Sequence, residues 1–281
     1  MKRQLLSLVG LLSAFSLGLG SSAAASGAPV WTEAGTSYVD SLSGGQGLAS
    51  RADGSLLHRG LLSIPLGLRI KGWNHVGDPD IAQGNVFDAY QGPDSATTKM
   101  FAVTTPAGKR YEYVHRLDPG EKLNNSFATV SPDGQWLVSG EWGDQDRLQV
   151  FPAPLLNPST PRTGGALPQA GPITLDRPVR DIQGCDFVDA TRLLCASDDG
   201  SRALFPEDRP LLQVDLEHAV DGSPVTGHVT SLFALPQRGV CDGTYEAEGV
   251  DYDTASGTLR AQVVQPGVCA VATSVYAYRL R

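Results

Sequence analysis

The chain has 281 residues, 41% of them hydrophobic, and a formal net charge of −8. Binding to nucleic acid or to an anionic membrane surface needs a basic face, and an acidic chain with few Lys or Arg clusters argues against both. Gly (32 residues) and Pro (19 residues) are spread evenly along the chain, which favours short elements separated by turns and argues against long helices.

Residues 1–28 are predicted to be a secretory signal peptide, and residues 29–281 a single domain. Lys2 and Arg3 precede an apolar run at 5–18, and the small residues that follow offer cleavage after Ala25 or Ala28. The run is too short for a stop-transfer helix, and no later stretch is long and apolar enough to span a bilayer. We therefore expect a secreted, extracellular protein of roughly 255 residues.

Five similar units follow the signal, each reading as three short β-prone runs separated by Gly, Pro, Asp or Asn. The expected strands lie at 46–49, 55–57 and 61–64 in the first unit, at 75–81, 84–89 and 99–103 in the second, at 127–130, 135–139 and 147–151 in the third, at 183–187, 192–195 and 211–214 in the fourth, and at 248–252, 257–260 and 274–278 in the fifth.

The third unit contains the clearest local signal. Phe127 to Val130 is apolar and β-prone, and Ser131-Pro132-Asp133-Gly134 follows. Pro132 fixes φ and Gly134 accepts a positive φ, so this tetrapeptide predicts a tight turn between two antiparallel strands.

A fourth strand is available after most units, at 111–117, 172–177 and 229–235. Four antiparallel strands per unit is the blade of a β-propeller, so the predicted fold is all-β with five blades. The fifth unit reaches Arg281 with only three strands, and residues 30–39 form another strand candidate. This N-terminal strand would complete the last blade and close the ring. A β-sandwich of two sheets is the alternative.

The four cysteines of an exported chain predict two structural disulfides. Three pairings are possible, and we favour Cys185–Cys195 with Cys241–Cys269. The first pair flanks a predicted strand–turn–strand segment, which would bring the two cysteines opposite each other.

The segment Ser131 to Leu137 resembles a WD-repeat-like blade. Blades of this kind, with a Ser-Pro-Asp-Gly turn, are common in bacterial propellers. The run 248–253 (Glu-Gly-Val-Asp-Tyr-Asp) is similar to a blade opening in lactonases of the gluconolactonase type. In that family a Glu, two Asn and an Asp surround one divalent cation in the central channel. The resemblance implies Glu248 as one ligand and places Asn125 near another, while Gln183 stands where Asn or Asp is expected.

The first strand of each propeller blade lines the central channel, so polar residues at the starts of the units should converge. The ligand-binding candidates are Gln46, His75, Asp78, Asn125, Gln183 and Glu248. Ca²⁺ takes six to eight oxygen ligands, and Glu248, Asp78 and Asn125 are the candidate metal ligands. A channel that holds only water would have the same polar lining.

The leading functional prediction is a scaffold that binds a small ligand, a glycan or a protein partner at the channel mouth. The alternative is a hydrolase of the lactonase or glycosidase type, which uses a channel cation or carboxylates such as Asp78, Asp186 and Glu248. Trp73 and Trp142 are candidate platforms for a sugar. A third interpretation of the sequence is a structural envelope protein whose channel holds only water. No nucleophile motif, HExxH or CxxC pattern is present in the sequence.

Overall fold

The computed structural model describes residues 30–124 and 126–281. The predicted signal peptide and Asn125 lie outside these residues. The described chain is mostly β, as the spacing of turn residues predicts, with four short helical segments: α1 (Ser41–Gly44), η1 (Leu61–Ser63), α2 (Leu66–Ile70) and η2 (Gly267–Val271). Within the described residues, none of the helices has the length and apolar character needed to cross a bilayer.

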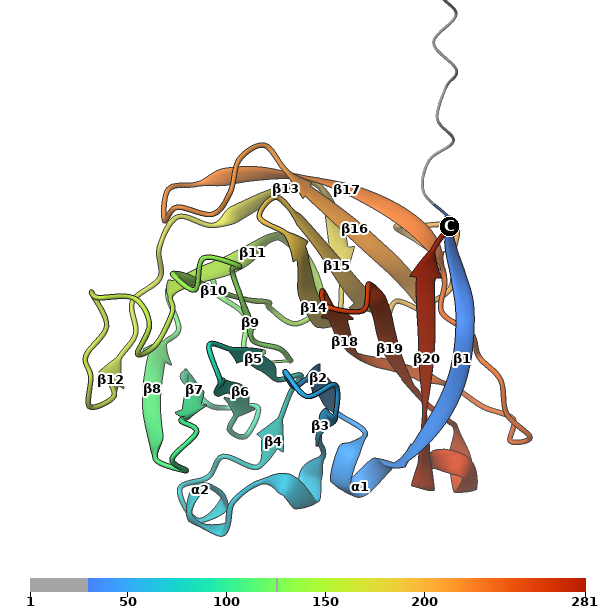
Figure 1. Ribbon diagram of the computed structural model, residues 1–281, viewed down its shortest axis with the longest axis horizontal. Helices are drawn as coiled ribbons and strands as arrows, with labels where there is room; N and C mark the ends of the chain where they lie inside the picture. Colours follow the sequence, from blue (N-terminus) through green and yellow to red (C-terminus); the bar gives the residue numbers. More distant parts are fainter. Residues whose placement is uncertain (1–29, 125) are drawn as a thin grey trace, which may run out of the picture.

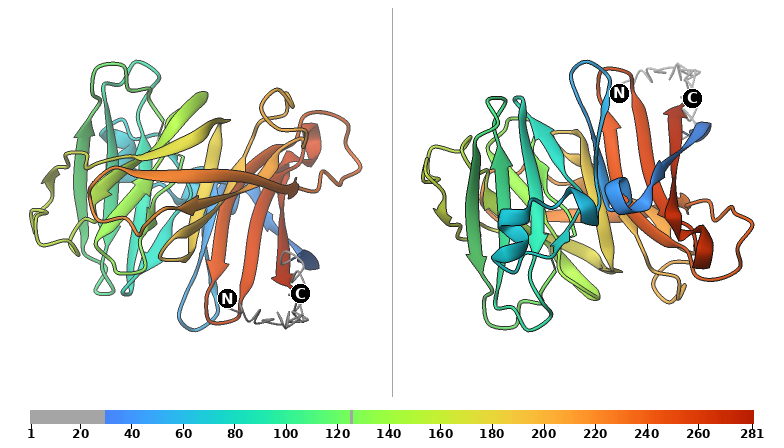
Figure 2. Two further views of the ribbon diagram at one scale, coloured as in Figure 1. Left: turned by 90° about the horizontal axis from the view of Figure 1, so that it is seen from above. Right: turned by 90° about the horizontal axis from the view of Figure 1, so that it is seen from below.

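The two ends of the described chain share one sheet (Figure 1). Its order is β1 (Trp31–Asp40), β20 (Ala272–Leu280), β19 (Thr258–Val264) and β18 (Glu246–Asp253), all antiparallel. β1 pairs along its length with β20, from Trp31 opposite Leu280 to Asp40 opposite Ala272. The start of β1 lies beside the end of β20 in Figure 1 and Figure 2, and the Arg281 N–H donates to the Val30 carbonyl at 3.1 Å. The expected pairing of an N-terminal strand with the last unit is confirmed.

An eight-stranded sheet contains the third and fourth units. Its order is β14 (Ile182–Asp189), β15 (Arg192–Ser197), β16 (Pro210–Leu216), β17 (Val225–Ala234), β13 (Ile173–Arg180), β11 (Asp144–Pro152), β10 (Trp136–Ser139) and β9 (Thr129–Val130). Two antiparallel four-stranded halves are joined where β13 pairs in parallel with β17. The end strands β9 and β14 contact each other, so the sheet nearly closes.

The second unit forms a sheet with the order β12 (Gly165–Ala166), β8 (Arg110–Arg116), β7 (Thr98–Thr104), β6 (Asn85–Gln91) and β4 (His75–Val76), and β5 (Asp80–Ala82) also pairs with β6. The turn predicted in the third unit is present between β9 and β10, with Gly134 at φ 74°.

The first unit differs from the expected pattern. It contains only β2 (Gly47–Ser50) and β3 (Leu56–Arg59), and the strand expected at 61–64 is instead helical. The Ser63 hydroxyl donates to the Gly60 carbonyl and accepts from the Gly60 N–H, which closes a helical turn at this point. Pro65 is the N-cap of α2, and its carbonyl accepts from the Leu68 and Arg69 N–H groups of the first turn. Local capping therefore outweighs the apolar character of Leu61 and Leu62.

The two predicted disulfides are confirmed. Cys185 and Cys195 are directly opposite each other on β14 and β15, and Cys241 is joined to Cys269. No free cysteine occurs among the described residues.

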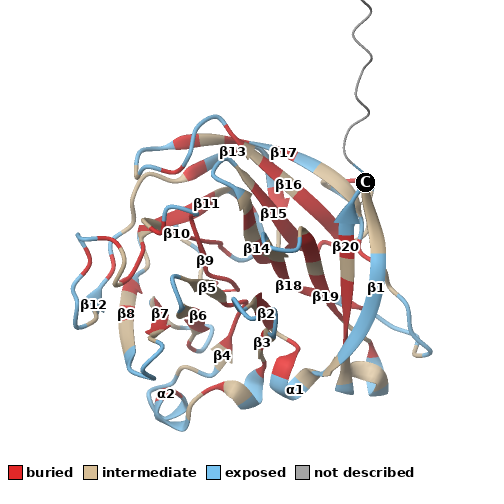
Figure 3. Ribbon diagram, in the orientation of Figure 1, coloured by how far each residue is buried: buried red, intermediate tan, exposed pale blue. Residues whose placement is uncertain are grey.

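The inner strands β2, β5, β9, β14 and β18 lie around the middle of Figure 1, and each contacts the next in that order, with β18 returning to β2. The apolar core is divided into four clusters, each between two consecutive units. Figure 3 shows the buried residues concentrated on these inward parts of the sheets, with exposed residues on outer strands such as β1. Polar side chains near the middle are consequently held by five separate units.

Candidate functional site

A cavity of about 570 Å³ lies at the end of the inner strands where β4 and β18 begin. Four of the predicted residues line it: Gln46, His75, Gln183 and Glu248, each from a different unit. The remaining lining residues are Asn74, Gln91, Gly92, Pro93, Asp94, Leu123, Asn124, Trp142 and Glu246. We call this space the polar cavity.

Glu248 on β18 is the most deeply placed acid of the polar cavity, with an exposed fraction of 4%. The Gln46 side-chain N–H donates to Glu248 Oε1 at 2.9 Å. Burial raises the pKa of Glu248 well above its usual range, and the nearby carboxyls of Glu246, Asp198 and Asp78 raise it further. The protonated, neutral form of Glu248 is therefore favoured, and it can donate a hydrogen bond into the cavity.

His75 on β4 is half-buried, and desolvation lowers its pKa. Its imidazole is accordingly neutral around pH 7 and offers one donor and one acceptor. Desolvation also raises the pKa of Glu246. The polar cavity is thus richer in neutral hydrogen-bonding groups than its residue types alone indicate.

Trp142, in the turn between β10 and β11, lines the polar cavity and is 53% exposed. Two neighbouring carbonyls, those of Asn124 and Gly140, are within 3.4 Å of Lys99 Nζ. Lys99 is fully buried, and desolvation lowers its pKa to about 8. Its ammonium fixes the two segments that carry Asn124 and Trp142.

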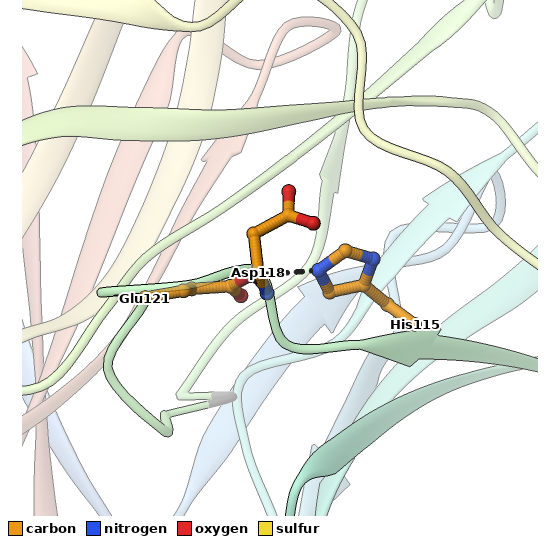
Figure 4. A group of neighbouring side chains, drawn as sticks. All are labelled: His115, Asp118 and Glu121. Carbon is orange, nitrogen blue, oxygen red and sulfur yellow. Dashed lines mark hydrogen bonds and ion pairs between the residues drawn. The ribbon is translucent and has the colours of Figure 1, made fainter.

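Lys99 belongs to a buried cluster with Glu121 and His115. Figure 4 shows the His115 and Glu121 side chains of this cluster. Glu121 Oε1 is 3.2 Å from Lys99 Nζ, and Oε2 is 2.8 Å from His115 Nε2. Burial alone would raise the pKa of Glu121, but the hydrogen bond from His115 and the charge of Lys99 outweigh it and lower the pKa to about 2. Through Lys99 the cluster stabilises the segments of Asn124 and Trp142, which form one side of the polar cavity; we call this side the rim.

His115, Asp118 and Glu121 have ligand atoms within 4.8 Å of one another, a spacing that a metal ion could use. However, His115 Nδ1 is 3.0 Å from the Leu167 carbonyl, and Nε2 faces Glu121. Both ring nitrogens therefore already have hydrogen-bonding partners within the protein, and neither is directed at an open metal position. The arrangement is that of an ion-pair cluster.

Asp78 lies below the floor of the polar cavity and is 1% exposed. Its two oxygens accept backbone N–H groups of Leu48 and Val250, each at 2.9 Å. Gly47, Gly184 and Gly249 pack so closely around it that a Cβ at any of them would lie within 2.6 Å of an Asp78 oxygen. Burial raises the pKa of Asp78 well above its usual range. Asp78 therefore fills the space between the inner strands and does not line the cavity.

A second cavity, of about 1140 Å³, lies at the opposite end of the inner strands; we call it the acidic cavity. Asp80, Asp186 and Asp251 line it, and each bonds across to another unit. Asp80 accepts from the Val130 N–H at 2.6 Å, Asp186 from the Tyr252 N–H at 2.7 Å, and Asp251 from the Ser50 N–H at 2.6 Å.

Burial of Asp80 raises its pKa to about 6, and the Asp251 charge adds to this. Burial also raises the pKa of Asp186, together with the charges of Asp80 and Asp251. The oxygens of Asp80 and Asp186 are occupied by backbone donors, since the Ile81 and Phe187 N–H groups bind them as well. These carboxylates stabilise the contacts between units.

The structure brings together four of the six predicted ligand-binding residues in the polar cavity. It places Asp78 beneath them, and Asn125 lies outside the described residues. Glu246, Asp94, Gln91 and Asn74 were not predicted. Glu246 had a detectable signal: it is two residues from Glu248 on one strand, and alternate residues of a strand point to the same face. The others come from loops and strand ends, where no such periodicity applies.

No protein-family model and no curated protein matches the chain. Among solved structures, a structural-genomics protein of unknown function from Bacteroides thetaiotaomicron VPI-5482, determined at 1.70 Å, is similar over 90% of this chain and 76% of that chain. The sequence identity is 10% and the TM-score 0.39. A likeness at this level carries no argument about activity.

Proposed function

We propose that the chain is an exported five-bladed β-propeller that binds a small polar ligand in the polar cavity. Three features support the propeller arrangement: the ring of contacts between inner strands, the pairing of β1 with β20, and the core clusters between consecutive units. Two disulfides support an oxidising, extracytoplasmic compartment, in keeping with the signal peptide predicted at 1–28.

One observation carries the binding function. Gln46, His75, Gln183 and Glu248 occupy corresponding positions in four separate units, and all four line one cavity. Its volume of about 570 Å³ is within the roughly 300–1,000 Å³ typical of small-molecule sites.

A hydrolase of the glycosidase type is the second candidate, because Glu246 and Glu248 line the same cavity from one strand and burial favours the protonated form of Glu248. Glycoside hydrolysis uses a protonated acid and a second carboxylate. Glu248 would donate the proton to the leaving oxygen, and Glu246 would act as the carboxylate.

The lactonase-type calcium site is less well supported by the geometry. Asp78, one of its three predicted ligands, has both oxygens occupied by backbone N–H groups that point toward them. Calcium binding by Glu248 stays a prediction. A thermal melt of the mature protein in EDTA and then in millimolar Ca²⁺ tests it, because a ligand at about 100 times its Kd adds roughly 2.7 kcal/mol of stability.

Binding and hydrolysis are distinguished by Glu248→Gln, measured by ligand titration and by turnover of glycoside and lactone substrates. A binding site should tolerate the change with a modest loss of affinity, because Gln keeps the shape and an oxygen. A hydrolase should lose turnover while its melting temperature stays the same. If no ligand from a broad polar panel shifts the melt of the wild-type protein, the binding proposal is wrong.

A further inference from the structure

The charged groups of the polar cavity limit which ligands it can bind. Its titratable lining residues are His75, Asp94, Glu246 and Glu248, and no Lys or Arg of residues 30–124 or 126–281 lines it. Binding sites for phosphate or carboxylate ligands normally supply a cationic side chain or a group of N–H donors. An anionic ligand would find no Lys or Arg among the described lining residues and would be repelled by those carboxyls that are ionised.

Carboxamides are the most frequent polar groups of the lining: Gln46, Asn74, Gln91, Asn124 and Gln183. A carboxamide both donates and accepts hydrogen bonds. Gln183 is only 7% exposed, lines the cavity, and has no side-chain hydrogen bond to any described residue. A ligand rich in hydroxyl groups, which also donate and accept, is the best match for such a lining.

Trp142 adds an apolar surface to this polar lining, and its ring is half-exposed at the cavity. An exposed indole pairs a broad apolar face with a single N–H donor. A pyranose ring has a complementary structure, with hydroxyl groups around its edge and a face of C–H groups. A sugar could thus place its C–H face on Trp142 and its hydroxyls on the carboxamides.

A cationic amine is the competing ligand, since ammonium groups bind to Trp faces and to carboxylates. Two features disfavour it. Only one of the four tryptophans lines the cavity, and burial favours the neutral form of Glu248. The net attraction for a cation is smaller than the number of carboxyls indicates.

We propose that the ligand is a neutral saccharide, with one ring stacked on Trp142 and its hydroxyls bound by Gln46, Gln183 and Glu248. This inference rests on the proposed binding function of the polar cavity, and it commits that function to one chemical class.

The test is a titration of the mature protein with a panel of neutral mono- and oligosaccharides, followed by intrinsic tryptophan fluorescence and by calorimetry. Quaternary ammonium compounds and organic acids form the comparison panels. The variants are Trp142→Ala and Gln183→Ala, and Trp136→Phe is the matched control. Trp136 packs at the start of β10 against Gly222 and does not line the cavity.

We expect a saccharide to bind and to protect Trp142 from a soluble quencher. Trp142→Ala should weaken binding at least about tenfold, as expected for truncation of an aromatic anchor. Gln183→Ala should weaken it less, and Trp136→Phe should leave it unchanged. Unchanged melting temperatures in the first two variants would show that the fold is intact.

The outcomes separate this inference from the proposed function. If an amine or an acid binds and depends on Trp142, but no saccharide binds, the saccharide inference is wrong and the binding function stands. If no compound of any panel binds, both are wrong. Saccharide binding that is equal in wild type and Trp142→Ala would place the sugar elsewhere and overturn the inference.

Discussion

The two cavities lie at opposite ends of the same inner strands, and their acids are used differently. In the acidic cavity, Asp80 and Asp186 have their oxygens filled by backbone N–H groups, one of them from another unit in each case. In the polar cavity, Glu248 is bonded only to the Gln46 side chain among the described residues. Burial raises the pKa at both ends. A raised pKa therefore does not distinguish a functional acid from a structural one, whereas the partners of its oxygens do.

The largest effect is expected from Lys99→Met, which tests whether the rim of the polar cavity is held by a buried charge. Removing the ammonium leaves Glu121 without one of its partners and frees the carbonyls of Asn124 and Gly140. Breaking a buried ion pair costs about 3–5 kcal/mol. Urea denaturation of the variant should show a loss of this size, and ligand binding should weaken because the Trp142 segment is less fixed.

Lys109→Met is the matched control for this change. Lys109 is exposed, and its ammonium lies over the Tyr111 ring, 4.6 Å from the centroid. An exposed contact of this type contributes about 0.5–1 kcal/mol. If the free energy of unfolding falls equally little in both variants, Lys99 does not hold the rim of the polar cavity in place.

The second largest effect is expected from Asp78→Ala, at the boundary between the two cavities. The change leaves the N–H groups of Leu48 and Val250 buried without acceptors. Each unsatisfied buried group costs roughly 1–3 kcal/mol, or about 2–6 kcal/mol for the two. Removing the desolvated Asp78 carboxyl offsets part of this cost, so we expect a loss of about 2–4 kcal/mol in the free energy of unfolding. Chemical denaturation measures it. A loss below about 1 kcal/mol would mean that Asp78 is not a link between units.

The elements with strong local signals could be predicted from the sequence. The turn at 131–134 is set by its own residues, with Gly134 at a positive φ and Ser131 and Asp133 bonded within the turn. The Cys185–Cys195 disulfide joins neighbouring strands of one hairpin, ten residues apart in the sequence. The strand predicted at 61–64 is wrong for a local reason too: the hydrogen bonds between Gly60 and Ser63 and the N-cap at Pro65 favour helical turns over a strand of apolar residues.

The polar cavity could be predicted in part because corresponding positions of repeated units converge in space. The links across units could not, since Asp186 bonds to Tyr252 and Asp78 to Val250 across long stretches of chain. Such bonds depend on how neighbouring units are aligned, which no local pattern encodes. Lys99 gave no signal either, because lysine is usually exposed and its burial depends on Glu121 and Gln149 arriving from other segments.

A change of pH is expected to have a smaller effect on stability. It tests whether burial of Asp80 in the acidic cavity favours its protonated form. The pKa of Asp80 is 3.8 unfolded and about 6 folded, so the folded state binds more protons between these values. Its contribution to stability is present at low pH and is lost as the pH rises through about 6. Lowering the pH from about 7 to about 5 should add ~1 kcal/mol through this group.

Asp80→Asn isolates that contribution, because Asn does not titrate. The lowered pKa of His75 has the opposite effect, since the unfolded state binds more protons there below 6.5. Denaturation of wild type and variant at both pH values cancels the His75 contribution. If the wild type gains no stability relative to Asp80→Asn on acidification, the carboxylate is not destabilised by burial.

The smallest effect is expected for the stability of Glu248→Gln, and it sharpens the contrast with Asp78. The amide oxygen can still accept from the Gln46 side chain, and the favoured protonated form of Glu248 is already neutral. The free energy of unfolding should therefore change by less than about 0.5 kcal/mol, with a gain only at pH values where Glu248 would ionise. Urea denaturation at acidic and alkaline pH measures both quantities. A loss as large as that of Asp78→Ala would mean that Glu248 also holds the units together, and the difference between the two ends of the inner strands would disappear.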